Sequence, residues 1–395
     1  THADVGDKAN DAIRVNGADL RVRVVGEGGN LGVTQRARIE FARNDGSINT
    51  DAIDNAGGVD CSDHEVNIKI ALDQVVAEGD LTDKQRNELL EEMTTEVADL
   101  VLANNYNQTQ ALSTARTESA SMADVHARYL SSMEAQGLID RDLEHLPDVE
   151  AMADRMLAGQ GLTTPEIAVV LAYTKNTLSE ALLGSAVPDD PTFEPILVNY
   201  FPTAMRDRFT EQIHAHRLRR EIIANRIANL VVDRAGTTML YRLSQETSAP
   251  AHDVAAAHMA AWQIFRLDGL NTAVNELDGQ VPVVRQLATH LSARQLAERA
   301  TRLMLRSRPY PFSAADAVAD LAGPVQAILG VLPEYLQGAD LAAFDALTAE
   351  VEADGVPSDL ARQVAALAPS LAALDVVEVA GWTGAAPDTL SLIHI

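Results

Sequence analysis

The sequence predicts the last part of an open α/β sheet over residues 1–117, followed by a mainly α-helical domain over residues 118–390. The one convincing strand pattern, Leu20–Val25, is followed by a glycine-rich break and then a helix, a succession typical of α/β sheets. After residue 117 the patterns are helical, with Gly and Pro between them. Residues 391–395 begin no recognisable element and are left as an unplaced tail that need not be native.

The first elements follow from alternation and capping residues. Leu20–Val25 alternates apolar and basic residues and ends in two valines, as a half-buried strand does. Thr34 then opens a helix that runs to about Arg43, and Asn44–Gly46 forms the turn after it.

Two further helices are predicted in the first part. Ser62 and Glu65 have the spacing of a capping box, so the next helix is predicted to run from Ser62 to about residue 78. Thr82, with Gln85 three residues later, caps a long amphipathic helix that reaches about Arg116.

The second part is predicted as a series of helices without a fixed repeat period. Thr164 is expected to cap one of them, with Pro165 at the first helical position. Residues 188–202 are expected to be a proline-punctuated linker. The predicted helices are 120–136, 149–157, 166–183, 203–214, 218–235, 251–266, 282–306, 314–329, 341–352 and 357–367.

Composition narrows the classes of function. A net charge of −26 repels phosphate backbones, so no nucleic-acid partner is expected. Cys61 is the sole cysteine, which excludes a disulfide framework and a cysteine-based metal site and fits a reducing, cytoplasmic compartment; no metal site is predicted. No apolar run approaches the roughly 20 residues of a membrane span, so no membrane is expected. The chain starts at Thr1 rather than Met, and we expect it to be a piece of a longer protein.

The glycine-rich break, Gly26–Gly32, lies where α/β sheets bind ligands, after a strand and before a helix. Its glycines allow backbone N–H groups to approach a ligand closely. Leu31 stands where the third Gly of the pyrophosphate fingerprint should fall, so we interpret the loop as lying near a nucleotide rather than as the phosphate cradle. The alternative is a tight turn without a ligand.

A second glycine pair follows Asn55 in the run Asn-Ala-Gly-Gly-Val-Asp-Cys-Ser. An Asn carboxamide donates and accepts at once, which suits an amide such as nicotinamide or a ribose hydroxyl. Ser62 is expected at a helix N-terminus, where free N–H groups favour an anion, and its hydroxyl can donate to a carboxylate. The alternative is that Ser62 only caps the helix.

Three further features have ordinary structural explanations. Cys61 is most simply a small buried residue, and His64 an exposed or packed helical residue. One stretch is strongly basic, and in so acidic a chain we expect it to dock onto an acidic surface of the same protein. A phosphate contact and a solvated helix face are the alternatives. The stretch comprises Arg206, Arg208, His214, His216, Arg217, Arg219, Arg220 and Arg226.

Two long motifs together resemble the large bacterial NAD-specific glutamate dehydrogenases. They are Gly-Glu-Gly-Gly-Asn-Leu-Gly-Val-Thr-Gln at 26–35 and Asn-Ala-Gly-Gly-Val-Asp-Cys-Ser-Asp-His-Glu-Val-Asn-Ile-Lys at 55–69. The resemblance continues in the lead-in at 2–15, in His-Arg-Leu-Arg-Arg-Glu-Ile-Ile-Ala at 216–224 and in Asn-Leu-Val-Val-Asp-Arg-Ala-Gly-Thr-Thr at 229–238. It covers the chain from its first residue to at least the 330s.

The resemblance implies oxidative deamination of L-glutamate to 2-oxoglutarate and ammonia. Hydride would pass to NAD on a Rossmann-like dinucleotide-binding domain, whose end is residues 1–117. By likeness to the smaller hexameric glutamate dehydrogenases, Asn55 lies by the nicotinamide, and Ser62 holds the substrate side-chain carboxylate with Gly58 and Val59 beside it. The other cofactor-binding residues implied are Glu27, Gly28, Gly29 and Asn30, the last three lining the nicotinamide ribose.

The resemblance also shows what is missing. The family's catalytic lysine and aspartate, and its main glycine-rich nucleotide turn, belong to segments upstream of residue 1. No catalytic residue is therefore assigned to this chain, which is expected to be inactive alone and to form a homo-oligomer through the full-length chain. The alternatives are a dehydrogenase of another amino acid, or a helical interaction or regulatory module that kept a sheet remnant. Ser62 favours glutamate, because it offers a partner to a side-chain carboxylate.

Overall fold

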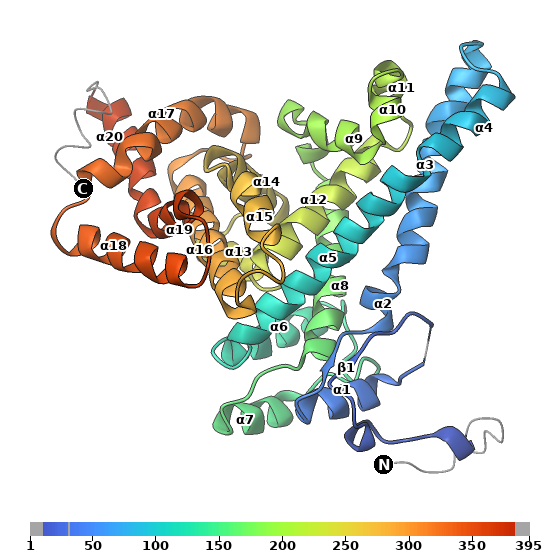
Figure 1. Cartoon of the computed structure of the whole chain (residues 1–395), viewed down its shortest axis with the longest axis horizontal. Helices are drawn as coiled ribbons and strands as arrows, with labels where there is room; N and C mark the ends of the chain where they lie inside the picture. Colours follow the sequence, from blue (N-terminus) through green and yellow to red (C-terminus); the bar gives the residue numbers. More distant parts are fainter. Residues whose placement is uncertain (1–10, 31, 384–395) are drawn as a thin grey trace. The chain divides into compact units, whose positions relative to one another are not determined.

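The computed structural model of the chain describes residues 11–30 and 32–383 (Figure 1). Contacts divide it into two compact units. Unit 1 comprises Thr1–Leu183 and Phe193–Thr238, and unit 2 comprises Gly184–Thr192 and Met239–Ile395. The two units are defined by how densely their residues contact one another, which does not test the predicted domain boundaries. The predicted domains over 1–117 and 118–390 therefore stay predictions. Leu31 and the predicted tail, residues 391–395, lie outside the described residues.

Unit 1 begins with a small parallel sheet. β1 (Val24–Val25) pairs with β2 (Ser47–Ile48), and α1 (Gln35–Arg43) is the crossover that joins them. The pairing covers less than the predicted strand Leu20–Val25, because within the described residues only Val24 and Val25 find a partner strand. Within the described residues, the sheet of the predicted α/β part thus consists of one strand–helix–strand unit.

Helix α1 begins and ends as predicted. Thr34 Oγ1 accepts a hydrogen bond from the N–H of Ala37, which caps the helix. Gly46 lies in the turn that follows, and a Cβ built on it would lie 2.3 Å from the ring of Phe41, so the close approach of this ring requires Gly. The core of this part consists of Phe41, Ala42 and Ile48, with Leu20, Val25 and Val33 packed against it.

Helices α2 (Asp51–Asp54) and α3 (Ala56–Glu78) correct one prediction. Because the chain re-enters a helix directly after Asn55, Gly57 lies in the first turn of α3 rather than in a loop. Ser62 stands inside the helix, and the predicted Ser62–Glu65 capping box is wrong. The spacing of these two side chains is also that of neighbours on a helix face, which the sequence alone could not separate from a cap.

The other helices of unit 1 follow α3 in the sequence. They are α4 (Asp83–Glu92), α5 (Thr94–Glu118), α6 (Ala123–Ala135), α7 (Val149–Leu157), α8 (Thr164–Leu183), α9 (Glu194–Tyr200), α10 (Thr203–Arg206), α11 (Thr210–His214) and α12 (Arg219–Ala235). α12 packs along α8, α5 packs against both, and α3 packs against α5. The helix predicted to run to residue 116 is two helices with a break at Met93, and the predicted linker contains α9.

Two helix starts test the capping predictions further. Thr82 and Gln85 form the predicted capping box at α4. At α8 the cap is Thr163 rather than Thr164, since the carboxylate of Glu166 accepts hydrogen bonds from both the N–H and the hydroxyl of Thr163.

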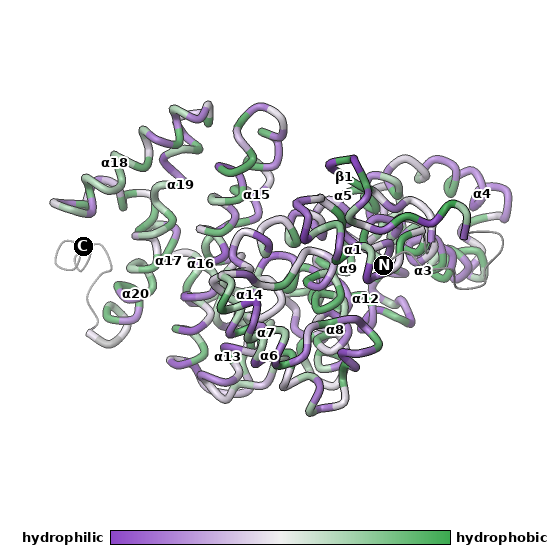
Figure 2. Tube along the Cα trace, turned by 90° about the horizontal axis from the view of Figure 1, so that it is seen from below, coloured by the Kyte–Doolittle hydropathy of each residue, from purple (hydrophilic) through white to green (hydrophobic). Residues whose placement is uncertain are grey.

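The described residues of unit 2 are helical, without a strand. Its helices are α13 (Met239–Thr247), α14 (Ala251–Ile264), α15 (Leu267–Asn275), α16 (Val283–Ser307), α17 (Ala314–Tyr335), α18 (Gly338–Ala353), α19 (Ser358–Ser370) and α20 (Ala372–Thr383). α14 is buried along most of its length and contacts α13, α16 and α17. α13, α15 and α20 were not predicted. Hydrophilic and hydrophobic residues alternate along most helices in Figure 2, as expected where one face of each helix is buried.

The sequence was expected to contain no segment apolar enough to span a membrane, and one helix of unit 2 does not meet this expectation. α17 is long and apolar enough by length and composition, with a mean hydropathy of 1.4 over an 18-residue window that is 28% buried. Residues 358–366 and 369–381, bent by 60°, would pass the same test as one broken span. Within the unit α17 packs against α14, α19 and α20.

Candidate functional site

The glycine-rich break connects β1 to α1 and has an open surface. A Cβ built on Gly28 or Gly29 would meet no atom within 4 Å. Both glycines and Asn30 are exposed, and the loop continues to Thr34 at the start of α1. The backbone at Gly28 and Gly29 is therefore exposed, and the binding of a ligand there stays a prediction.

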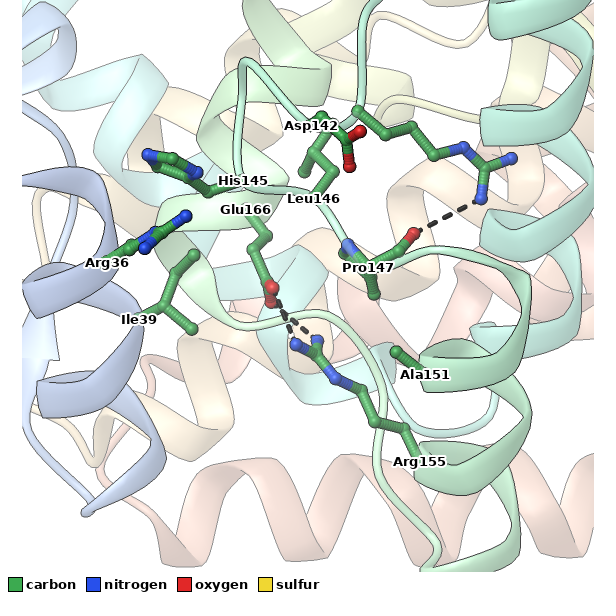
Figure 3. Close-up of a pocket in the computed structure, with 10 residues that line it drawn as sticks. Arg36, Ile39, Asp142, His145, Leu146, Pro147, Ala151, Arg155 and Glu166 are labelled. Atoms are coloured by element: carbon green, nitrogen blue, oxygen red, sulfur yellow. Dashed lines mark hydrogen bonds and ion pairs between the residues drawn. The ribbon is translucent and has the colours of Figure 1, made fainter.

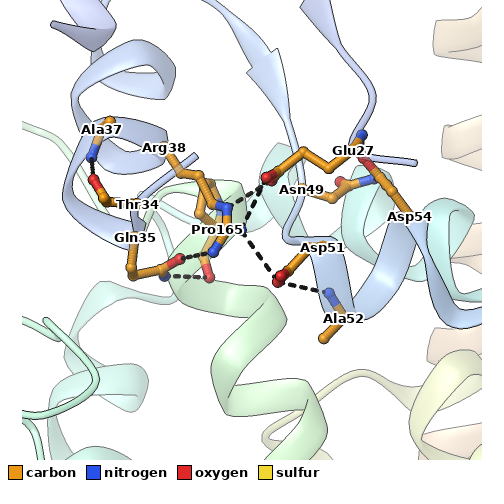
Figure 4. Close-up of polar contacts among 10 residues, drawn as sticks. All are labelled: Glu27, Thr34, Gln35, Ala37, Arg38, Asn49, Asp51, Ala52, Asp54 and Pro165. Atoms are coloured by element: carbon orange, nitrogen blue, oxygen red, sulfur yellow. Dashed lines mark hydrogen bonds and ion pairs between the residues drawn. The ribbon is translucent and has the colours of Figure 1, made fainter. Parts of the chain in front are cut away.

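Glu27 is the exception in this loop, because its side chain points inward. Its carboxylate accepts two hydrogen bonds from the guanidinium of Arg38, at 2.6 Å from Nε and 2.9 Å from Nη2 (Figure 4). Both side chains are buried, and Arg38 Nη2 also lies 3.1 Å from Asp51 Oδ1. The carboxylate is committed to Arg38 and the backbone N–H to Asp54, so any polar contact of Glu27 with a cofactor would be made by its backbone carbonyl.

Hydrogen bonds around this ion pair connect the loop to α1 and α2, and connect α1 to α8. The N–H of Glu27 donates to Asp54 Oδ2 at 3.0 Å, and Asn49 Nδ2 donates to the other oxygen of the same carboxylate. Gln35 accepts from Arg38 and donates to the carbonyl of Pro165 in α8 (Figure 4). The loop is thus anchored at Glu27 by residues of α1 and α2.

The structure brings two predicted cofactor residues together. Asn55, between α2 and α3, donates a hydrogen bond from its carboxamide to the carboxamide oxygen of Asn30 in the glycine loop. Asn55 is half-buried and Asn30 is exposed. The contact sets a pair of amide groups beside the open glycines, where donors and acceptors are both available.

The three predicted substrate residues share one exposed face of α3. Gly58 and Val59 precede Ser62 by four and three residues, which places both next to Ser62 on the helix surface. Val59 is 77% exposed, and Gly58 and Ser62 are exposed as well. This face begins in the first turn after Asn55, so the predicted cofactor and substrate residues are neighbours along one helix end.

The opposite face of α3 is buried and polar, which sequence analysis missed. Asp60, His64 and Asn67 lie along it, and Asn104 Nδ2 of α5 donates to Asp60 Oδ2 at 2.7 Å. Burial lowers the pKa of His64, which is packed as one of the two expectations had it. Cys61, expected to be buried, is exposed instead.

A second buried charged pair supports this polar layer. Lys175 Nζ in α8 lies 2.7 Å from Asp233 Oδ1 in α12. Burial lowers the pKa of Lys175 and raises that of Asp233, so each charge depends on the other. Arg226 lies in α12 two turns before Asp233, and its guanidinium donates a hydrogen bond to Asn104 Oδ1 at 2.6 Å. Helical spacing alone gave no signal for these residues, because their partners lie on distant segments.

The basic stretch is only partly solvated. Arg206 pairs with Glu96 at 2.9 Å, His214 Nδ1 lies 3.3 Å from Glu194, and Arg226 is buried inside the unit. Arg217 is exposed. Contacts within the same unit support the expected docking onto acidic groups for part of the stretch, and the absence of a nucleic-acid partner stays a prediction.

A separate cavity of about 330 Å³ lies between α1, α7, α8 and the segment before α7 (Figure 3). Arg155 and Glu166 form a two-point ion pair in its wall, with both N–O distances 2.8 Å. None of the predicted site residues lines it. Its lining residues are Arg36, Ile39, Arg141, Asp142, His145, Leu146, Pro147, Ala151, Arg155 and Glu166.

Two family models match the chain. Residues 159–395 match the family described as glutamate dehydrogenase, C-terminal, and residues 1–115 match the bacterial NAD-glutamate dehydrogenase catalytic domain. The first match covers more than half of the chain, and the second contains every predicted site residue.

Curated relatives give the same picture. The chain is 46% identical over 385 residues to an NAD-specific glutamate dehydrogenase of Pseudomonas aeruginosa, covering 97% of the chain and 24% of the relative. It is 43% identical to one of Halomonas elongata, covering 100% and 24%. It is 41% identical to one of Mycobacterium tuberculosis, covering 95% and 23%. The chain thus spans about a quarter of the length of these relatives.

The buried ion pair below the glycine loop yields the first prediction. Glu27→Gln keeps the size of the side chain but leaves the charge of Arg38 compensated only by Asp51. Breaking a buried pair from one side costs several kcal/mol, and we expect a loss of about 3 kcal/mol in local stability. Native-state hydrogen exchange of the α1 amides measures it, because a chain of two units need not unfold in one step.

Glu40→Gln on the same helix is the matched control. No described residue pairs with the Glu40 carboxylate, so its removal should change the protection of α1 by less than about 0.5 kcal/mol. Equal protection of α1 in the two variants would contradict the role given to the ion pair.

Proposed function

Since the chain belongs to the family of the bacterial NAD-specific glutamate dehydrogenases, we propose that it supplies the nicotinamide side and the substrate side of one active site. The full-length protein would oxidise L-glutamate, with NAD as the hydride acceptor, to 2-oxoglutarate and ammonia. The observation that carries the proposal is the contact between Asn30 and Asn55 beside the open glycines, at the end of the helix that exposes Ser62.

The cofactor side of this site fits a nicotinamide. The carboxamides of Asn30 and Asn55 offer the donors and acceptors that match an amide or a ribose hydroxyl. Gly28 and Gly29 leave room for a ring or sugar against the backbone. The parallel β1–α1–β2 unit supports the proposal that residues 1–117 are the end of a Rossmann-like domain, whose ligands bind at the carboxyl ends of the strands.

The substrate side fits a side-chain carboxylate. Ser62 lies inside α3 and has no capping role, so its hydroxyl is free to donate to a carboxylate oxygen. Val59, exposed one turn earlier, offers an apolar contact to the methylene groups of glutamate. This pairing favours glutamate over an amino acid with an apolar side chain. A cytoplasmic location and a homo-oligomeric enzyme are part of the same proposal.

Proton transfer in this reaction needs a base, and we propose that it comes from the rest of the full-length protein. The carboxylates nearest to Ser62 have other partners: Asp60 accepts from Asn104, Asp63 accepts from Tyr200, and Glu65 pairs with Lys69. A general base must lie within hydrogen-bond reach of the proton it removes. The residues of this site therefore bind and orient, and they do not move the proton.

Ser62→Ala in the full-length protein tests the substrate side. We expect the KM for glutamate to rise roughly tenfold or more, since one hydrogen bond to a charged group is worth about 1.5–3 kcal/mol, and the KM for NAD to stay unchanged. The melting temperature should not fall, because Ala favours a helix interior. Cys61→Ala, at the exposed neighbouring position, should leave both KM values unchanged. An unchanged glutamate KM in Ser62→Ala would refute the assignment.

If the catalytic base comes from the rest of the full-length protein, residues 1–395 alone should not catalyse the reaction. The purified chain, shown to be folded by its helical circular dichroism, should form no NADH from glutamate and NAD. The full-length protein, assayed under the same conditions, should form it. Turnover by the isolated chain at a rate comparable to the full-length protein would show that the base lies within this chain.

A further inference from the structure

The turn of α3 that follows Ser62 is held by one aromatic side chain from a distant segment. Tyr200, the last residue of α9, is buried, and its hydroxyl donates to Asp63 Oδ2 at 2.7 Å. The same hydroxyl accepts from Asn67 Nδ2 at 2.9 Å. Its ring stacks on His64, with ring centroids 4.3 Å apart and planes 20° apart. One side chain thus contacts three residues on two successive turns of α3.

The protonation state of Tyr200 determines that its hydroxyl is the donor in the hydrogen bond to Asp63. Burial and the carboxylate of Asp63 raise the pKa of Tyr200 far above its ordinary value, so the hydroxyl keeps the proton that it donates. Asp63, the residue after Ser62, accepts the hydrogen bond from this hydroxyl. A hydrogen bond to an ionised carboxylate is among the stronger ones in proteins, which makes this contact a firm attachment point.

A histidine from the same segment adds a backbone contact. His216 Nδ1 accepts from the N–H of Leu218 at 3.1 Å, so its proton lies on Nε2, which donates to the carbonyl of Asn67 at 3.1 Å. Burial lowers the pKa of His216 and favours this neutral form. Tyr200 and His216 both lie in the part of the chain that matches the C-terminal family model, whereas α3 matches the catalytic one.

The location of these polar contacts argues against an ordinary core. The buried face of α3 is polar at Asp60, His64 and Asn67, directly behind the exposed Gly58–Ser62 face, and becomes apolar from Ile68 onward. Apolar residues would stabilise the packing with less desolvation, so a buried polar stripe at this one level fixes geometry.

We propose that Tyr200 is a positioning residue, which sets the orientation of the Ser62 face through Asp63, His64 and Asn67. The proposal rests on the function proposed for Ser62, and it gives the helical segment after α8 a role in substrate affinity. Because Ser62 would bind the substrate carboxylate equally before and during the reaction, misplacing it should raise KM and leave kcat unchanged.

The test uses Tyr200→Phe in the full-length protein, since this variant loses both hydrogen bonds and keeps the stacked ring. The KM for glutamate should rise on the order of tenfold, with kcat and the KM for NAD unchanged. Amide hydrogen exchange over residues 56–67 should become faster. In the double variant with Ser62→Ala, KM should not exceed that of Ser62→Ala alone, because both changes act through one group.

Tyr129→Phe is the matched control, because it also removes one partly buried hydroxyl, 3.0 Å from Thr174 Oγ1, away from α3. It should change neither KM nor exchange over 56–67. Unchanged KM and exchange in Tyr200→Phe, or multiplying effects in the double variant, would overturn the proposal. If Ser62→Ala alone has no effect, the substrate assignment fails, and exchange over 56–67 decides whether Tyr200 positions α3. Should Tyr200→Phe not fold, Asp63→Asn at an exposed position tests the same contact.

Discussion

The buried ion pair between Glu27 and Arg38 is the constraint on which the site depends. A loop with this many glycines has a large conformational entropy and cannot hold one shape by itself. Among the described residues of the loop, Glu27 is the buried one, and it pairs with Arg38 of α1, which in turn pairs with Asp51 of α2. The cost of desolvating these charges is offset only while all partners stay in place. Asn30, three residues after Glu27 in the same loop, accepts a hydrogen bond from Asn55.

Helix α3 begins directly after Asn55, which contacts the glycine loop, and it connects this region to other helices of unit 1. Its exposed face presents Gly58, Val59 and Ser62, and its buried face is attached through polar contacts to α5 and α9. In the proposed site, one side of α3 would bind the substrate and the other side would be supported by residues of the segment that matches the C-terminal family model.

The sequence predicted the local features well and the long-range ones poorly. Thr34, Thr82 and the bounds of α7 were predictable, because caps and helix periodicity depend on residues a few positions apart. The start of α3 was not, because two glycines next to Asn55 are as typical of a loop as of a first helical turn. The proximity of Asn30 to Asn55 came from resemblance rather than from spacing.

The buried polar layer could not be predicted from the sequence. Tyr200 and Asp63 are 137 residues apart, and neither lies in a pattern that indicates its partner. The sequence around Lys175 predicts only a helix, and nothing in it indicates that the lysine pairs with Asp233. Such pairs form only when distant segments pack together, and the local spacing of residues in a single sequence does not indicate them.

The most direct test of the account is a structure of the full-length protein with NAD and glutamate bound. The account predicts the nicotinamide carboxamide within about 3 Å of Asn55 and the glutamate side-chain carboxylate at the same distance from Ser62 Oγ. It also predicts that Glu27 still pairs with Arg38 below the loop. Density for both ligands in a site that does not include the glycine loop and the exposed face of α3 would contradict it.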